Sequence, residues 1–139
     1  MASFVGATTV RIHVLGEVDR PPTAAEQLQM EALVDAAMRE GAMGVGASLI
    51  YAPACYAATP ELIGLAAVAG RHDGLYIAHL RSEGATFLEA LEEHVRIARE
   101  GNVRAEVYHL KAAGRSYWHK LDAAIARIEA ARSEGVRLT

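Results

Sequence analysis

The sequence predicts an α/β fold in which parallel strands alternate with helices, and three observations support this class. Short apolar runs rich in β-branched residues recur along the 139 residues, and each precedes a segment with helical periodicity. The central runs lack polar alternation, which is typical of strands that are buried on both faces of a parallel sheet. Glycines that we expect to end helices stand at positions 41, 74, 101 and 135, at a spacing typical of β/α units.

The length of the chain limits how many such units it holds. A closed (β/α)8 barrel takes about 200 residues or more, so this chain has room for about four units. The last expected strand, from residue 136, stops after four residues. We therefore expect residues 1–139 to form a single domain that is part of a TIM-type (β/α)8 barrel; an open parallel sheet is the other arrangement.

Each element is predicted from local signals. Thr23 and Glu26 fit a capping box that begins a helix, and Thr59 followed by Pro60 fits the start of another. The expected elements, in order, are a strand and loop over 4–16, a helix over 23–41, a strand over 42–50, a loop over 51–57, a helix over 59–74, a strand over 75–79, a helix over 85–100, a strand over 103–109, a helix over 117–134 and a strand from 136.

Composition limits the classes of function. A hydrophobic content of 52% and a charged content of 22% fit a globular protein. A net charge of −3, with basic residues scattered singly, argues against a nucleic-acid or acidic-membrane partner. No apolar run approaches the ~20 residues of a membrane span. A single cysteine, Cys55, and the lack of a secretory leader pattern lead us to expect a cytoplasmic protein.

Two histidines end neighbouring predicted strands and form the main candidate site. His79 ends the run Tyr76–His79, and His109 ends the run Glu106–His109, 30 positions later. Parallel strands bring their carboxyl ends to one edge, where enzymes of this architecture carry their chemistry. Two imidazoles suit zinc, although zinc sites usually have at least three protein ligands. The alternative is that both histidines are structural residues.

Polar residues beside the two histidines are further candidates. Lys111 follows His109 by two positions and is expected on the same strand face, where its ammonium suits a substrate carboxylate. Tyr51 ends an earlier strand and offers a phenol donor. Arg81 and Glu83 follow His79 by two and four positions, and one interpretation is a local ion pair between them without a chemical role. Each of these residues also has a purely structural interpretation.

Other reactive residue types are expected to be structural. We expect Cys55 to be inert because nothing near it in sequence activates a thiol. His13 is expected to be structural, and Trp118 a packing anchor. The histidines on helical or connecting segments are expected at the surface: His72, His94 and His119. The chain has no phosphate loop, no GxGxxG and no CxxC motif, which excludes the common nucleotide cradles.

Three ordered stretches carry a resemblance to a known family. The stretches Gly44–Pro53, Tyr76–Gly84 and Tyr108–Gly114 resemble the N-acyl-D-amino-acid deacylases, or D-aminoacylases, of the amidohydrolase superfamily. The resemblance extends over almost the whole chain. It implies a metal-dependent (β/α)8 barrel beside a small β-sandwich, and hydrolysis of the amide bond in N-acyl-D-amino acids.

The resemblance also implies roles for single residues. His79 and His109 match zinc-binding histidines at the ends of the fifth and sixth barrel strands. Lys111 matches a lysine that binds the substrate α-carboxylate, and Tyr51 matches a tyrosine near the substrate. Arg81 is a further candidate for substrate binding. The ligand would be a small-molecule N-acyl amino acid, and the cofactor one or two zinc ions.

The chain departs from the family pattern at other ligands. It has no His-x-His pair, which the family carries on its first strand, and Cys55 does not match the family's bridging cysteine. The catalytic aspartate of the eighth strand would lie beyond Thr139. The expectation is therefore the central part of a deacylase barrel, with no general base assigned. The alternatives are an inactive half-barrel that self-associates through its exposed edges, and an unrelated small α/β binding domain.

Overall fold

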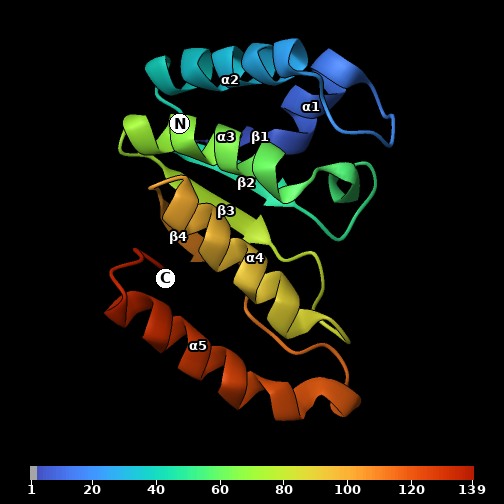
Figure 1. Ribbon diagram of the computed structural model, residues 1–139, viewed down its shortest axis with the longest axis vertical. Helices are drawn as coiled ribbons and strands as arrows, with labels where there is room; N and C mark the ends of the chain where they lie inside the picture. The colour runs from blue at the N-terminus through green and yellow to red at the C-terminus, as the bar shows by residue number, and fades with distance from the viewer. Residues whose placement is uncertain (1–2) are drawn as a thin grey trace.

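Parallel strands and helices alternate along the chain and form one sheet covered by a layer of helices (Figure 1). The structure is a computed structural model that describes residues 3–139. The four strands are adjacent in sequence order and all pairs are parallel. The predicted α/β class is confirmed. The elements are β1 (Val5–Gly6), α1 (Ala7–Leu15), α2 (Ala24–Arg39), β2 (Gly44–Ser48), α3 (Thr59–Arg71), β3 (Leu75–His79), α4 (Phe87–Glu100), β4 (Arg104–Val107) and α5 (Leu121–Ser133), with short 3-10 turns at Ala54–Tyr56 and Arg115–Lys120.

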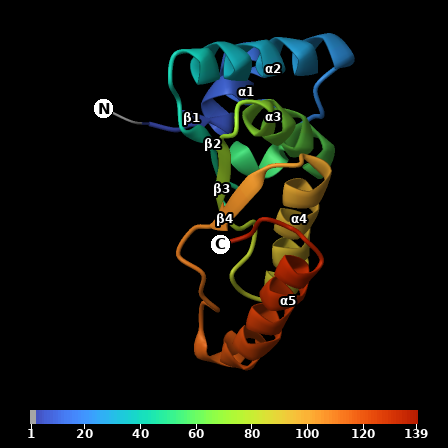
Figure 2. The same cartoon turned by 90° about the vertical axis from the view of Figure 1, so that its left-hand side faces the viewer.

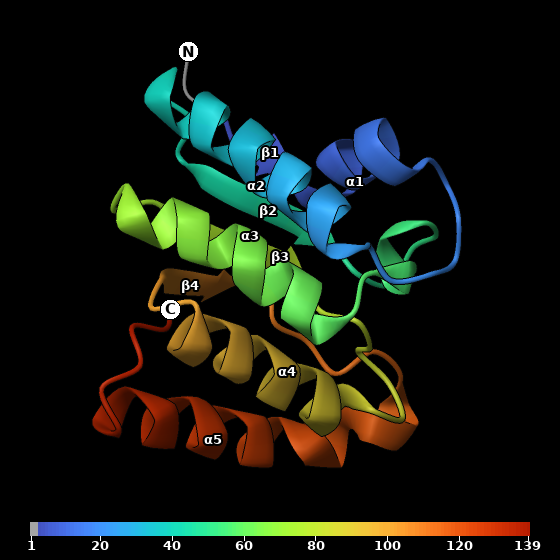
Figure 3. The same cartoon turned by 45° about the horizontal axis from the view of Figure 1, so that its top comes forward.

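The helices cover one face of the sheet, and the other face stays open (Figure 2). Helices α2, α3, α4 and α5 lie side by side in chain order (Figure 3). The register aligns Val45 with Tyr76, and Tyr76 with Ala105. These three side chains point to the helices and are buried. Their strand neighbours, such as Ile77, point to the open face and are only half-buried. This asymmetry is that of a barrel wall with helices outside.

The first segment differs from its prediction. A strand followed by a loop was expected over 4–16, but the strand ends at Gly6 and residues Ala7–Leu15 form helix α1. Buried positions 7, 10, 11 and 15 follow a helical period, so packing against α2 and β2 overrides the β-propensity of the branched residues. His13 lies on the exposed side of this helix, where nothing indicates a ligand role.

The capping signals are mostly confirmed. The Thr23 hydroxyl accepts a hydrogen bond from Glu26 N at 3.3 Å, and a Glu26 carboxylate oxygen accepts one from Thr23 N at 2.7 Å. Thr59 is instead the first residue of α3, after Ala58 as N-cap. Gly41 and Gly135 have a positive φ after their helices, as expected for glycines that end a helix. At the ends of α3 and α4 the residues with positive φ are Asp73 and Asn102, and not the neighbouring Gly74 and Gly101.

The strand expected from residue 136 is reduced to a bridge on the free edge of β4. Leu138 pairs with Ala105 in parallel, and Val107 N donates to Thr139 O at 2.9 Å. The helix expected over 117–134 begins at Leu121, and Trp118 before it is 64% exposed, so its predicted packing role is wrong. Within residues 3–139, every helix is too short or too polar to cross a bilayer.

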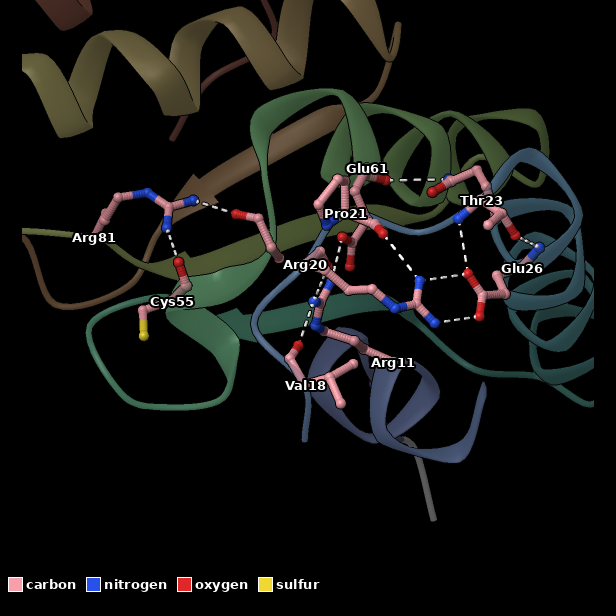
Figure 4. A network of polar contacts seen from close by, with 11 residues as sticks. Arg11, Val18, Arg20, Pro21, Thr23, Glu26, Cys55, Glu61 and Arg81 are labelled. Atoms are coloured by element: carbon pink, nitrogen blue, oxygen red, sulfur yellow. Dashed lines mark hydrogen bonds and ion pairs between the residues drawn. The ribbon is translucent and has the colours of Figure 1, made fainter. Parts of the chain in front are cut away.

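The core contains polar side chains that the sequence did not reveal. Arg11 and Glu61 form a buried ion pair, and Arg11 Nη2 also donates to the carbonyls of Val18 and Arg20 at 3.0 and 2.7 Å (Figure 4). This pair joins α1 and α3 to the connection between α1 and α2. His94, expected at the surface, is 2% exposed under Tyr76, so that expectation is wrong. His72 and His119 are exposed as predicted.

Candidate metal centre

The two predicted histidines meet at the carboxyl edge of the sheet. His79 is the last residue of β3 and lies on the open face with Ile77. Strand β4 ends at Val107, two residues earlier than predicted, and His109 has a φ of 43°. Strand alternation from buried Val107 would turn His109 towards the helices. The left-handed backbone, which histidine tolerates better than most residues, breaks this alternation. Its ring therefore lies beside His79.

The rings of His79 and His109 are held edge to face. Their centroids are 4.7 Å apart and their planes form an angle of 79°. His79 Nδ1 lies 3.0 Å from the carbonyl oxygen of Leu80. Because a carbonyl only accepts, Nδ1 carries the proton and Nε2 of the neutral ring keeps its lone pair. Such a backbone contact is typical of histidines that bind metals.

Glu83 completes the cluster, and sequence reasoning missed its role. Its Oε1 atom lies 3.3 Å from His79 Nε2 and 3.4 Å from His109 Nδ1. The same oxygen contacts Lys111 Nζ, which lies 2.8 Å from His109 Nδ1. The local ion pair between Arg81 and Glu83, which was one interpretation of their spacing, does not form, because Arg81 pairs with Glu93 and Glu83 with Lys111. The available signal was the spacing of four residues from His79.

The three side chains fit a zinc ion. One donor atom from each of His79, Glu83 and His109 lies within 4.8 Å of the others. Two imidazoles and a carboxylate are a common protein ligand set of catalytic zinc, which keeps a further position open. Glu83 is 9% exposed, whereas His109 lies at the surface, so the cluster is open on one side. Among residues 3–139, this is the one group of three His, Cys, Asp or Glu side chains whose donor atoms lie close enough together to hold one metal ion.

A groove on the open face leads to this cluster. It has a volume of about 570 Å³ and includes His79, Tyr51 and Tyr108 among its lining residues. Tyr51 lies in the loop after β2, is 63% exposed, and its ring centroid is 5.7 Å from that of His79. The structure thus brings Tyr51 close to His79 and Lys111 close to His109. Both residues lie in loops, because β2 ends at Ser48 and β4 at Val107, and not on strands as predicted.

Arg81 is engaged elsewhere. Its guanidinium donates twice to the Glu93 carboxylate, at 2.8 and 2.9 Å. It also donates to the carbonyl oxygens of Cys55 and Ala57 at 2.8 and 2.7 Å, which Figure 4 shows in part. None of its hydrogen bonds within residues 3–139 involves the histidine cluster. Cys55 enters this network through its backbone, and its half-buried thiol is free.

Curated proteins with similar sequences are deacylases. The chain is 35% identical over 130 residues to the D-aminoacylase of Alcaligenes xylosoxydans xylosoxydans, covering 94% of this chain and 27% of that protein. The N-acyl-D-aspartate deacylase of that organism is 40% identical over 112 residues, and these cover 80% of this chain and 22% of the relative. The chain thus spans about a quarter of the relatives' length. No family model matches it.

Solved structures show the same fold at the same level of identity. The N-acyl-D-glutamate deacylase from Bordetella bronchiseptica, solved with zinc and a phosphonate inhibitor, superposes with a TM-score of 0.95 at 34% identity. The match covers 99% of this chain and 29% of that one. A D-aminoacylase crystal structure described as defining a subset of amidohydrolases superposes with a TM-score of 0.92 at 35% identity, over 98% of this chain and 28% of its own. The resemblance drawn from the three sequence stretches is confirmed, and the fold is that of part of these proteins.

Proposed function

Since the chain corresponds in sequence and fold to a segment of the D-aminoacylases, we propose that it is part of a zinc-dependent amidohydrolase acting on N-acyl-D-amino acids. The observation that supports this most directly is the cluster of His79, Glu83 and His109 at the carboxyl edge of the sheet. Its donor types match zinc, and the groove beside it offers room for a small molecule.

Each side chain of the cluster has a role in this proposal. His79 and His109 hold the metal through ring nitrogens, and Glu83 adds a carboxylate oxygen. When bound there, zinc supplies Lewis-acid polarisation of an amide carbonyl and a water of lowered pKa. The contact of His79 Nδ1 with the Leu80 carbonyl fixes the ring so that Nε2 faces the cluster.

The neighbouring residues are proposed to orient the substrate. Lys111 presents an ammonium that can neutralise the α-carboxylate of an N-acyl amino acid. Tyr51, at the rim of the groove, offers its hydroxyl as a donor to a ligand oxygen. Arg81, a third candidate from the sequence, is better placed to support the loop that carries Tyr51, because it binds the carbonyls of Cys55 and Ala57. A general base is not assigned to any residue of this chain.

The test is the zinc content of the purified chain after dialysis against chelator and re-addition of zinc. We expect one tightly held zinc per chain in the wild type and its loss in His109→Ala. His72→Ala is the matched control, because His72 is an exposed histidine that pairs with Asp35. A wild-type chain that retains no zinc would contradict the proposed site. Hydrolysis of N-acyl-D-amino acids is then assayed on the loaded protein.

A half-barrel that self-associates is the second candidate. It is favoured by the open face of the sheet (Figure 2), where apolar side chains such as Ile77 are only half-buried. A metal-free dimer whose stability is the same in His109→Ala would support this candidate. Sedimentation at several protein concentrations, with and without zinc, separates the two.

A further inference from the structure

The ammonium of Lys111 already lies where a metal would bind. It contacts Glu83 Oε1 and lies 2.8 Å from His109 Nδ1, so it reaches two of the three donor residues. We propose that Lys111 is an internal cation that fills the site in the metal-free chain and that metal binding displaces it. This inference rests on the proposed metal site and adds a switch to it.

The displacement follows from the lone pairs involved. An ammonium only donates, so His109 Nδ1 must present its lone pair to Lys111. Glu83 Oε1 likewise directs its electron density to the ammonium. A metal ion needs the same lone pairs, because coordination and hydrogen-bond acceptance at one nitrogen exclude each other. Lys111 and the metal therefore compete for the one lone pair of His109 Nδ1, and at Glu83 Oε1 two cations would lie side by side and repel each other.

The burial of the two side chains indicates that metal binding moves Lys111 and leaves Glu83 in place. The side chain of Glu83 is 11% exposed, whereas that of Lys111 is 49% exposed. Backbone near Lys111 is tied to Glu83, since Ala113 N donates to Glu83 O at 2.7 Å. Within residues 3–139, Lys111 is the one lysine or arginine that forms an ion pair with Glu83. Exchange of the ammonium for a metal therefore keeps this nearly buried carboxylate compensated throughout.

Displacement of Lys111 would couple the binding of a metal to the binding of an anion. Once a metal holds Glu83 and His109, the Lys111 ammonium has lost its contact with His109 Nδ1 and is repelled from Glu83 by the metal, so it is free to bind an anion. Metal loading thus prepares the chain for a carboxylate ligand. By thermodynamic reciprocity, an anion that holds Lys111 away from the cluster tightens metal binding by the same factor.

The first test is the zinc dissociation constant, measured by competition with a chromophoric chelator. We expect Lys111→Met to bind zinc about 10-fold more tightly than the wild type, because the competing cation is gone. Lys120→Met is the matched control, since Lys120 Nζ contacts the Ala85 carbonyl and no residue of the cluster. Zinc binding that is unchanged or weaker in Lys111→Met would overturn the inference.

The second test distinguishes displacement from simple repulsion between charges. The Cε–Hε cross-peak of Lys111, assigned by its absence from the Lys111→Met spectrum, should move to the position of solvated lysines when zinc is added. A peak that keeps its metal-free position while zinc binds would overturn displacement. Failure of the wild type and both variants to bind zinc at all would instead reject the metal site, and the switch with it.

Discussion

The imidazole of His109 meets that of His79 edge to face, with centroids 4.7 Å apart, although 30 residues separate them in the chain. The parallel pairing of β3 with β4 brings the two strand ends together. The positive φ of His109 then turns its ring to the open face. Backbone conformations of this kind persist where the surroundings hold them, and they cluster at functional sites.

Glu83→Gln should weaken zinc binding selectively. The amide keeps the shape of the side chain but removes the negative charge and offers a poor zinc ligand. We expect the dissociation constant for zinc to rise by at least about 10-fold. Glu106→Gln is the matched control, because Glu106 lies half-buried on β4 opposite Ile77 and outside the cluster. Equal affinity in the two variants would remove Glu83 from the ligand set.

Arg11→Met should destabilise the fold strongly. It would leave the Glu61 carboxylate buried without its partner, and it would remove the donors to the Val18 and Arg20 carbonyls. We expect the free energy of unfolding, measured by urea titration, to fall by about 3–5 kcal/mol. The double variant Arg11→Met/Glu61→Met should recover part of this loss. A double variant less stable than the single one would contradict this explanation.

His94 should make the fold sensitive to acid. Burial lowers the pKa of His94 to about 4, from an ordinary value of 6.5. Between these values the unfolded chain binds a proton that the folded chain does not, so stability is full above pH 6.5 and falls as the pH drops towards 4. A shift of this size corresponds to a loss of about 3 kcal/mol.

The measurement is urea unfolding at several pH values, in chelator, for wild type and His94→Leu. Leucine has a similar volume and removes the two ring nitrogens, which have no hydrogen-bond partner in the structure. The difference in pH dependence between the two proteins isolates His94 from the other histidines. Parallel curves for the two proteins would show that His94 does not titrate as described.

Arg81→Met should loosen the loop that carries Tyr51. The carbonyls of Cys55 and Ala57 would lose their donor, and Glu93 would lose its partner. We expect faster amide hydrogen exchange over residues 51–57 and a loss of about 1–3 kcal/mol in unfolding free energy. Arg96→Met is the control, because Arg96 forms an exposed pair with Glu100 on the same α4 helix as Glu93, and an exposed pair of this kind contributes little to stability. An unchanged exchange rate over 51–57 would show that Arg81 does not hold this loop.

Gly44→Ala and Gly46→Ala should differ sharply. A Cβ at Gly44 would lie 1.9 Å from the Leu75 carbonyl oxygen, and the φ of Gly44 is 151°. We expect a loss of more than about 4 kcal/mol, seen as insoluble or unfolded protein. At Gly46 the nearest atoms would be at 3.5 and 3.7 Å, an ordinary contact, so this variant should fold and retain zinc. Similar yields of both variants would contradict the close approach of β2 and β3.

Local signals made most of the fold predictable. The capping box at Thr23 and the apolar runs of β2 and β3 are read from neighbouring residues, and each lies where it was expected. Helix α1 was missed because its branched residues favour a strand, and only packing against α2 and β2 decides otherwise. His94 was missed because a polar residue on a helix is usually exposed.

The histidine pair was predictable for a geometric reason, and Glu83 was not. Two strand ends in one parallel sheet lie at the same edge, so the approach of positions 79 and 109 was predictable from their places in the chain. The orientation of the His109 ring was not, because it depends on the positive φ of that residue. The contacts of Glu83 with His109 and Lys111 depend on the backbone turn at His109. No pattern in the sequence encodes that turn.

The one-sided layering of helices has a consequence for the strength of every charge at the site. Lys111 and His109 are exposed to water, where the local dielectric constant is high. Two unit charges 4 Å apart interact by about 1 kcal/mol in bulk water and by about 4 kcal/mol at an effective dielectric constant of 20. Any layer that covers the open face, whether further barrel wall or a second chain, would strengthen these interactions roughly fourfold. The strength of the charge–charge interactions at this site therefore depends on what covers the open face of the sheet.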